Sequence, residues 1–332
     1  VNGVQQTLSE QADYPSQGAN FGVNESGARL AVGTHSGSVA SYGLNSYICE
    51  YVLIDGQQLA PTSFGEFDED SGIWKPINVS GLTFGTNGYY LDFEDSANLG
   101  NDANGGTDLT EVDLTSIDQT TDVPTNNFAT LNPLNYTSTA IPYSEGNTYG
   151  TFPGAWMASL PTIGLTNGKW FWEAKLNSGN DANMFYGVAR EGIDLDTSPQ
   201  NQTGVIVQKN DGDRYVDGSY SAGAAESIAS GNTLGVALDL DSGTKTIKFY
   251  KNGTLLSSGS SINLTSNFDG YTLFPIFIGN SSSATAEWQT NFGNPAYAIS
   301  SGNADGNGYG NFEYAVPSGY FALCTKNLAE YG

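Results

Sequence analysis

The sequence is poor in the residues that carry most catalytic and metal-binding chemistry. Its 332 residues include one histidine, two cysteines and two methionines. With His35 as the single histidine, neither a Ser–His–Asp triad nor a zinc site has a supporting motif. Cys49 and Cys324 lie near opposite ends of the sequence, so we expect two small buried hydrophobic residues and no disulfide.

Basic residues are also scarce. Only 11 lysines and arginines stand against 35 aspartates and glutamates, which gives a formal net charge of −24. Such a chain repels phosphate backbones and anionic lipids, so we expect no nucleic-acid partner. It has no run of about 18 apolar residues, so no membrane insertion is predicted. Neutral sugars, protein surfaces and cations remain as partners, and a role of the acidity in solubility alone stays open.

What the sequence does contain is typical of an all-β fold. The segment "KWFWEAKL" alternates with period two, which predicts a half-buried strand with apolar residues on one face (Trp170, Trp172, Ala174, Leu176) and exposed ones on the other (Lys169, Glu173, Lys175). The segment "TLGVALDLDSGTKTIKFYKNGTLL" predicts consecutive antiparallel strands, with a hairpin turn at Asn252 and Gly253. "YTLFPIFIG" is apolar on both faces, as in a central strand.

The first hundred residues predict short strands at "ARLAVG", "SYICEYVLIDG" and "GYYLDF". No segment predicts a convincing amphipathic helix, although Pro61 and Gly65 can delimit one short turn. Residues 95–150 are rich in Asp, Asn, Thr and Gly and are the expected domain boundary. We therefore predict an all-β chain built from two antiparallel β-sandwiches.

The chain opens on Asn2 and Gly3, a strong hairpin signal that only Val1 precedes. A sandwich that lacks its preceding strands has open edges and an uncovered apolar face. We therefore expect the missing strands to lie in a longer natural polypeptide or to come from a partner chain.

Residues 131–332, with "NGKWFWEAKL", "FYGVAR", "GVALDLD", "FYKNG" and "LFPIFIG", resemble a SPRY domain, a bent β-sandwich of the concanavalin A-like type. The ending "FEYAVPSGYFALCTKNL" is similar to the close of SPRY-containing proteins of tailed bacteriophages. The run from "EYVLIDGQQL" to "TDVPTNNFATLNP" resembles the region that joins a laminin-G-like jelly roll to a SPRY domain in phage structural proteins.

The resemblance implies two concanavalin A-like sandwiches in tandem. Residues 1–94 would be the C-terminal part of a laminin-G-like jelly roll that is incomplete at its N-terminus, 95–150 a connecting segment, and 151–332 a SPRY-like sandwich. It also implies a non-enzymatic protein of the virion surface, in a fibre, spike or capsid decoration. Its expected partners are host-surface glycans, other virion proteins and further copies of itself.

Two alternatives stay open. One is a polysaccharide-degrading enzyme on the same scaffold, although the array Glu-x-Asp-x-x-Glu of such enzymes is absent, and the acids at Glu66, Asp68, Glu69 and Asp70 fit a solvated turn. The other is a scaffold that binds only virion proteins.

SPRY domains bind ligands through loops along one rim of the sandwich, and this implies two candidate loops. Residues 177–183 contain Asn180, and residues 209–223 offer tyrosine rings and carboxylates for a sugar (Asp211, Asp213, Tyr215, Asp217, Tyr220). The alternative interpretation of the second loop is a hairpin with ordinary turn residues.

No cofactor is required by any motif, but calcium is a candidate ligand of the segment "DFEDSANLGNDANGGTD". Its Asp95, Asp102 and Asp108 supply hard oxygen ligands on a flexible backbone. The spacing does not fit an EF-hand, and aspartates in such turns also cap backbone amides, so both interpretations stay open.

Overall fold

A computed structural model describes residues 3–4, 6, 27, 29–35, 43–44, 47–69, 72–134, 140–153, 156–178, 183–256, 261–280 and 286–332. The chain divides into two compact units, Val1–Gln119 with Val123–Thr125, and Thr120–Asp122 with Asn126–Gly332. Within the described ranges, no helix has the length and apolar character that a membrane span requires.

The first unit contains two small antiparallel sheets. Strand β1 (Tyr51–Leu53) pairs with β4 (Tyr89–Leu91), and β2 (Gly65–Phe67) pairs with β3 (Trp74–Pro76). The described residues of this unit also form two 3-10 helices, η1 (Pro61–Ser63) and η2 (Ser116–Asp118), and η1 confirms the short turn predicted there. Its small core is formed by Val79, Phe84 and Tyr90.

One expectation for this unit was wrong, and another falls partly outside the described residues. Residues 29–33 of the segment "ARLAVG" form no strand. Val1 and Asn2 lie outside the described residues, whereas Gly3 occupies a turn with a φ of +70° next to the Trp74 ring. A laminin-G-like jelly roll stays a prediction for this part of the chain.

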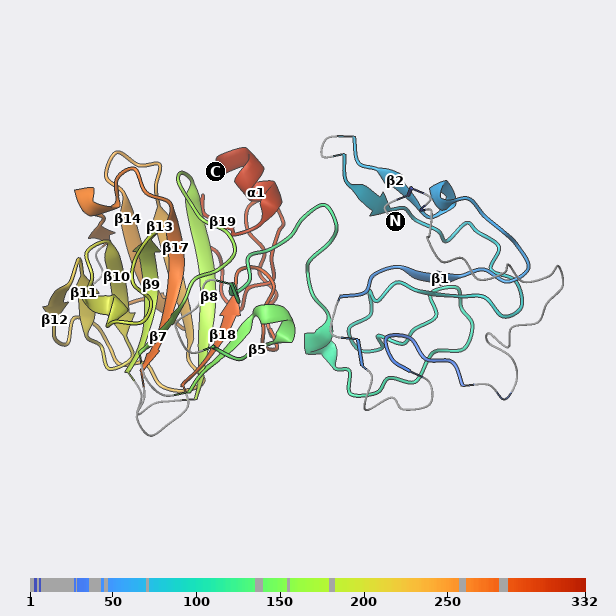
Figure 1. Cartoon of the computed structure of the whole chain (residues 1–332), viewed down its shortest axis with the longest axis horizontal. Helices are drawn as coiled ribbons and strands as arrows, with labels where there is room; N and C mark the ends of the chain where they lie inside the picture. The colour runs from blue at the N-terminus through green and yellow to red at the C-terminus, as the bar shows by residue number, and fades with distance from the viewer. Residues whose placement is uncertain are drawn as a thin grey trace. The chain divides into compact units, whose positions relative to one another are not determined.

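The second unit is a β-sandwich of two sheets in which all strand pairs but one are antiparallel (Figure 1). The first has six strands in the order β12-β11-β10-β9-β17-β7, and these are β7 (Met157–Ser159), β9 (Asn183–Arg190), β10 (Val205–Lys209), β11 (Arg214–Val216), β12 (Ser219–Ser221) and β17 (Leu273–Asn280).

The second sheet has nine strands, seven of them in the order β15-β14-β13-β8-β18-β6-β5. These are β5 (Tyr143–Ser144), β6 (Tyr149–Phe152), β8 (Lys169–Ser178), β13 (Thr233–Asp239), β14 (Thr246–Lys251), β15 (Thr254–Leu255) and β18 (Ala286–Asn291), while β16 (Ile262–Asn263) pairs with β14 and β19 (Phe321–Ala322) with β8. Short 3-10 helices lie between strands: η3 (Glu145–Asn147), η4 (Pro199–Asn201) and η5 (Ser266–Phe268).

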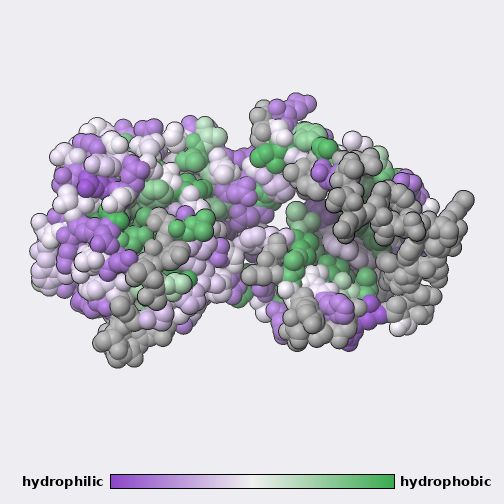
Figure 2. Space-filling view, viewed as in Figure 1, coloured by the Kyte–Doolittle hydropathy of each residue, from purple (hydrophilic) through white to green (hydrophobic). Residues whose placement is uncertain are grey.

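The core lies between these two sheets. The apolar face predicted for β8 is buried, with Trp170, Trp172 and Leu176 fully inaccessible to solvent. Aromatic rings from the facing sheets meet edge to face, as Tyr186 of β9 and Phe249 of β14 do at 5.4 Å between ring centroids. Hydrophilic residues cover much of the face of this unit shown in Figure 2, between smaller hydrophobic patches.

The predicted hairpin at Asn252 and Gly253 is confirmed. Their φ angles of +48° and +75° are those of the two-residue turn that matches strand twist, and the turn joins β14 to β15. Strand β17 is buried along most of its length, as its two apolar faces predicted.

The prediction that β8 is only half-buried was wrong, because its second face is covered as well. Phe171 and Glu173 are only 2% and 1% exposed, because residues 292–324 pack across the outer face of the nine-stranded sheet. Phe312 from this segment contacts the Phe171 ring edge to face at 5.4 Å. The period-two pattern identifies the strand but does not show that a later segment covers its polar face.

The C-terminus holds the one α-helix of the described residues, α1 (Thr325–Tyr331), where the sequence predicted none; in Figure 1 it lies beside β19. Its Tyr331 ring stacks on Phe321 at 3.9 Å, so tertiary packing stabilises a helix too short to form alone. Cys324 is buried as expected, but Cys49 is exposed because it precedes β1 and lies outside the small core of the first unit.

Candidate functional site

The second candidate loop forms the outer edge of the six-stranded sheet. Strands β10, β11 and β12 follow one another through two tight turns, and Tyr215 of β11 lies opposite both Val207 and Tyr220. All three residues of β12 are exposed. We call β10, β11, β12 and the turns between them, residues 205–223, the β10–β12 edge.

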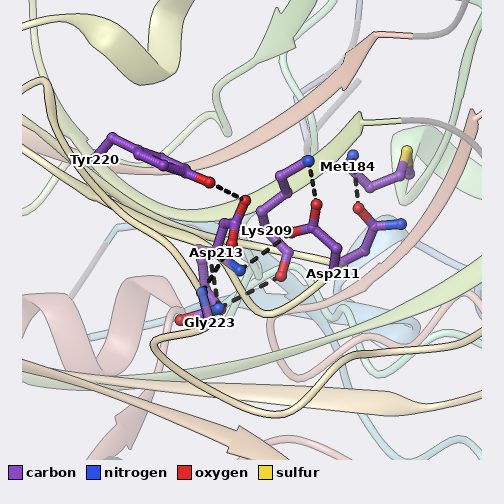
Figure 3. Close-up of polar contacts among 8 residues, drawn as sticks. Met184, Lys209, Asp211, Asp213, Tyr220 and Gly223 are labelled. Atoms are coloured by element: carbon purple, nitrogen blue, oxygen red, sulfur yellow. Dashed lines mark hydrogen bonds and ion pairs between the residues drawn. The ribbon is translucent and has the colours of Figure 1, made fainter.

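Asp213 fixes the position of an exposed tyrosine at this edge. Its carboxylate accepts a hydrogen bond from the Tyr220 hydroxyl at 2.8 Å and another from the Gly223 amide at 2.9 Å (Figure 3). Asp211 pairs with Lys209 and accepts the Asp213 amide at 3.1 Å. The loop is therefore ordered by its own carboxylates.

The rings of Phe185, Tyr215 and Tyr220 form a short row. The Tyr215 ring lies 5.7 Å from Phe185, edge to face, and 5.2 Å from Tyr220 between centroids. Tyr220 is 54% exposed, whereas Tyr215 is half-buried and packs on the outer apolar cluster of this sheet. Tyr215 therefore supports the ring of Tyr220, which faces solvent.

The ionisation states at this edge follow from the same hydrogen bonds. Burial alone would raise the pKa of Asp213, but the hydrogen bonds from Gly223 and Tyr220 and the charge of Lys209 outweigh it and lower the pKa. The hydrogen bond to Asp213 raises the pKa of Tyr220. At neutral pH the edge thus presents an ionised carboxylate bound to a protonated phenol.

The remaining predicted ligand residues lie elsewhere. Asp217 follows the far end of β11, with a φ of +51°, and its carboxylate accepts the Gly204 amide at 2.7 Å and the Thr265 hydroxyl. This is the turn role that the alternative interpretation foresaw. Asn180 lies outside the described residues. The structure therefore brings together Asp211, Asp213, Tyr215 and Tyr220 from the predicted set.

The three candidate calcium ligands bind the backbone of their own loop. Asp102 is 4% exposed and accepts the amides of Tyr90, Asn104 and Gly106 at 2.9 to 3.1 Å. Asp108 accepts the Asp102 amide at 3.0 Å, and Asp95 accepts the Ala97 amide at 2.9 Å.

In the part of the chain that the structure describes, no group of three or more His, Cys, Asp or Glu residues is arranged to hold a metal ion. A calcium site at these aspartates stays a prediction, and the observed contacts are those of turn capping. The acids Glu66 and Asp68 lie beside Lys75, at 3.5 and 3.1 Å, while Asp70 is not among the described residues.

Sequence reasoning missed a buried carboxylate on the outer face of the nine-stranded sheet. Glu173 accepts the backbone amides of Glu313 and Tyr314, each at 2.9 Å, and its Oε2 also lies 3.3 Å from the Asn291 amide nitrogen and 3.4 Å from the Tyr297 hydroxyl. Burial raises the pKa of Glu173 to about 7, against the opposing effect of these four donors. The only signal in the sequence is an acid placed between large aromatic and aliphatic residues in "WFWEAKL".

Comparison with known proteins finds similarity within the second unit. The family model of the SPRY domain matches residues 169–295, which include the β10–β12 edge. No curated protein matches the chain. Among solved structures, the chain is similar to the SPRY domain of human HERC1, with 18% identity over 48% of this chain and 96% of that one and a TM-score of 0.40. A second human SPRY domain has 19% identity over 48% and 97% of the two chains, with a TM-score of 0.37.

Proposed function

We propose that the chain is a non-catalytic binding protein in which the SPRY domain formed by residues 169–295 is the recognition module and the β10–β12 edge is its contact surface. The observation that carries this proposal is the exposed Tyr220 ring, whose hydroxyl is fixed by Asp213. A ring that is already ordered loses little conformational entropy when a ligand packs on it.

The ligand that fits this edge best is a glycan. A flat tyrosine face packs on the apolar side of a sugar ring, while the neighbouring carboxylates of Asp211 and Asp213 accept hydrogen bonds from its hydroxyl groups. One such contact is weak, so useful adhesion requires many copies on one particle. This requirement agrees with a homo-oligomeric fibre, spike or capsid decoration on the virion of a tailed phage, the role implied by the sequence segments that resemble phage structural proteins.

A second candidate function is favoured by the edge itself. Among the described strands, β12 pairs only with β11, and its other side carries free backbone groups. An extended peptide could add there as a further strand. In that case the partner would be a protein, and the chain a scaffold for other virion proteins.

A glycan array tests the first function. We expect the wild-type chain, presented on multivalent beads, to bind a subset of bacterial surface glycans, and Tyr220→Ala to lose at least tenfold of that binding. Tyr271→Ala is the matched control, because Tyr271 is also exposed, at 42%, in the same unit but outside the β10–β12 edge. Tyr220→Phe keeps the ring and separates its packing from the hydrogen bond to Asp213.

Equal losses in Tyr220→Ala and Tyr271→Ala would contradict a role of this edge. A blank array, together with binding of a virion protein that Tyr220→Ala abolishes, would favour the protein-binding function. Antibodies against the chain that leave particles of the source phage unlabelled in electron micrographs would contradict the virion role.

A further inference from the structure

A polar hollow lies on the outer face of the nine-stranded sheet, away from the six-stranded sheet that carries the β10–β12 edge. Its floor is a row of residues across three neighbouring elements. Lys175 of β8 lies opposite Thr233 of β13, and Asn252 of the hairpin accepts the Thr233 amide at 3.0 Å. Its walls are formed by Tyr297, Glu313 and Tyr314, which belong to residues 292–324, the segment that covers this face of the sheet. We call this site the Lys175 hollow.

The walls of the Lys175 hollow are held in place by packing. The Tyr314 ring lies against the hairpin so closely that a Cβ on Gly253 would come within 2.5 Å of it. Tyr297 is buried, and its ring lies under the Lys175 ammonium group, 5.4 Å from the centroid. The backbone of Glu313 is bound to the buried Glu173. Since Tyr297 and Glu173 are themselves buried, packing fixes the position of these two supports.

Two opposite charges face this hollow without meeting. The Lys175 ammonium makes no hydrogen bond or ion pair to any residue that the structure describes; its contact is with the face of the Tyr297 ring. The Glu313 carboxylate accepts the amide of Ser300 at 2.7 Å and also its hydroxyl. The charge of Lys175 contributes to the lowered pKa of Glu313, after the two hydrogen bonds from Ser300, so the two groups lie near each other.

These charges determine the class of ligand. An anion would be repelled by the Glu313 carboxylate, and a cation by the Lys175 ammonium. A hydroxyl group both donates and accepts a hydrogen bond, so neighbouring hydroxyl groups can accept from the ammonium and donate to the carboxylate at once. Asn252 adds an exposed amide at the rim.

We propose that the Lys175 hollow binds one uncharged sugar ring, with two neighbouring hydroxyl groups bridging Lys175 and Glu313. This site is separate from the β10–β12 edge, and its walls lie outside the residues that the SPRY model matches. It therefore stands or falls independently of the proposed function of that edge.

Saturation-transfer NMR with methyl glycosides of glucose, galactose, mannose and N-acetylglucosamine tests the proposal on the full chain. We expect at least one of the four to receive saturation from the wild-type protein. Lys175→Met keeps the aliphatic stem over Tyr297 and removes the donor, and Glu313→Gln removes the charge of the acceptor; each should weaken binding at least tenfold. Lys248→Met is the matched control, because Lys248 lies on β14 of the same sheet but outside the hollow, and it should bind as the wild type does.

Three results would overturn the proposal. The first is that none of the four glycosides receives saturation from the wild-type protein. The second is that Lys175→Met transfers saturation as well as the wild type does. The third is that Tyr220→Ala loses the transfer while Lys175→Met keeps it. The last result would place the sugar at the β10–β12 edge instead. Since Lys175 is half-buried and its stem is kept, circular dichroism and the melting temperature verify that Lys175→Met is folded.

Discussion

Glu173 makes the stability of the second unit depend on pH in an unusual direction. Its carboxyl group is 1% exposed, and burial raises its pKa from 4.5 to about 7. A carboxyl group with a raised pKa in the folded state contributes its full stabilisation below its unfolded pKa, where both states are protonated. This contribution is lost as the pH rises from about 4.5 to about 7, because the unfolded chain then ionises freely. At 1.36 kcal/mol for each pKa unit, the loss is about 3 kcal/mol.

The perturbation that isolates this effect is Glu173→Gln, which cannot ionise. We would measure the free energy of unfolding in urea, by tryptophan fluorescence, at pH 5, 6, 7 and 8 for both proteins. The general repulsion within this acidic chain changes similarly in both and cancels in the difference. We expect the wild-type chain to gain up to about 3 kcal/mol relative to Glu173→Gln as the pH falls from 8 to 5. Glu330→Gln, an exposed substitution in α1, should show no such trend.

The opposite trend would refute this reasoning. Four donors point at Glu173, among them the backbone amides of Glu313 and Tyr314, and hydrogen bonds to a carboxylate favour its charged form. If the wild-type chain loses stability relative to Glu173→Gln as the pH falls, these donors outweigh burial and the pKa lies below 4.5. Hydrogen exchange at the two amides provides a local check, because protonation of Glu173 weakens at least one of their bonds.

Two further predictions concern other carboxylates. Asp305 is 8% exposed and accepts hydrogen bonds from the Ala322 amide at 2.9 Å and the Asn327 side chain at 2.7 Å. Asp305→Ala should therefore lower the free energy of unfolding by about 2–3 kcal/mol and increase amide hydrogen exchange in α1. An unchanged urea midpoint would contradict this. The Asp102 carboxylate already accepts three backbone amides, so we expect the melting temperature to be the same in 5 mM calcium and in chelator. An increase of several degrees with calcium that is lost in Asp102→Asn would instead establish a calcium site.

The strands of the second unit could be predicted because their burial follows the pleat. Trp170 and Trp172 alternate with smaller or polar residues, and the positive φ that Asn252 and Gly253 tolerate marks a hairpin without tertiary information. The exposure of Glu173 was predicted wrongly because residues 292–324, which cover it, have neither a helical nor a strand period. Their path depends on turns and on contacts such as Phe312 with Phe171, which become visible only in three dimensions.

The candidate site, too, could be predicted from the sequence only in part. The resemblance to SPRY domains placed Tyr215 and Tyr220 in one candidate loop, with a hairpin as the alternative interpretation, and in the structure the two residues lie opposite each other in the hairpin of β11 and β12. Which tyrosine faces solvent depends on the packing of Tyr215 against Phe185 of the adjacent β9, which sequence spacing does not determine. Likewise, nothing in the sequence distinguishes Asp213, which holds Tyr220, from Asp217, which holds a turn.

The excess of acids over bases explains why acidic residues were weak guides to function in this chain. With 35 acids and 11 bases, most carboxylates have no cation to pair with, and many bind backbone amides instead, as Asp102, Glu173 and Asp305 do. A carboxylate that already accepts two or three such bonds has little capacity left for a metal or a substrate. The informative groups are those whose interactions the fold leaves incomplete. These are the exposed ring of Tyr220 and the ammonium of Lys175, and both proposed sites are therefore built around them.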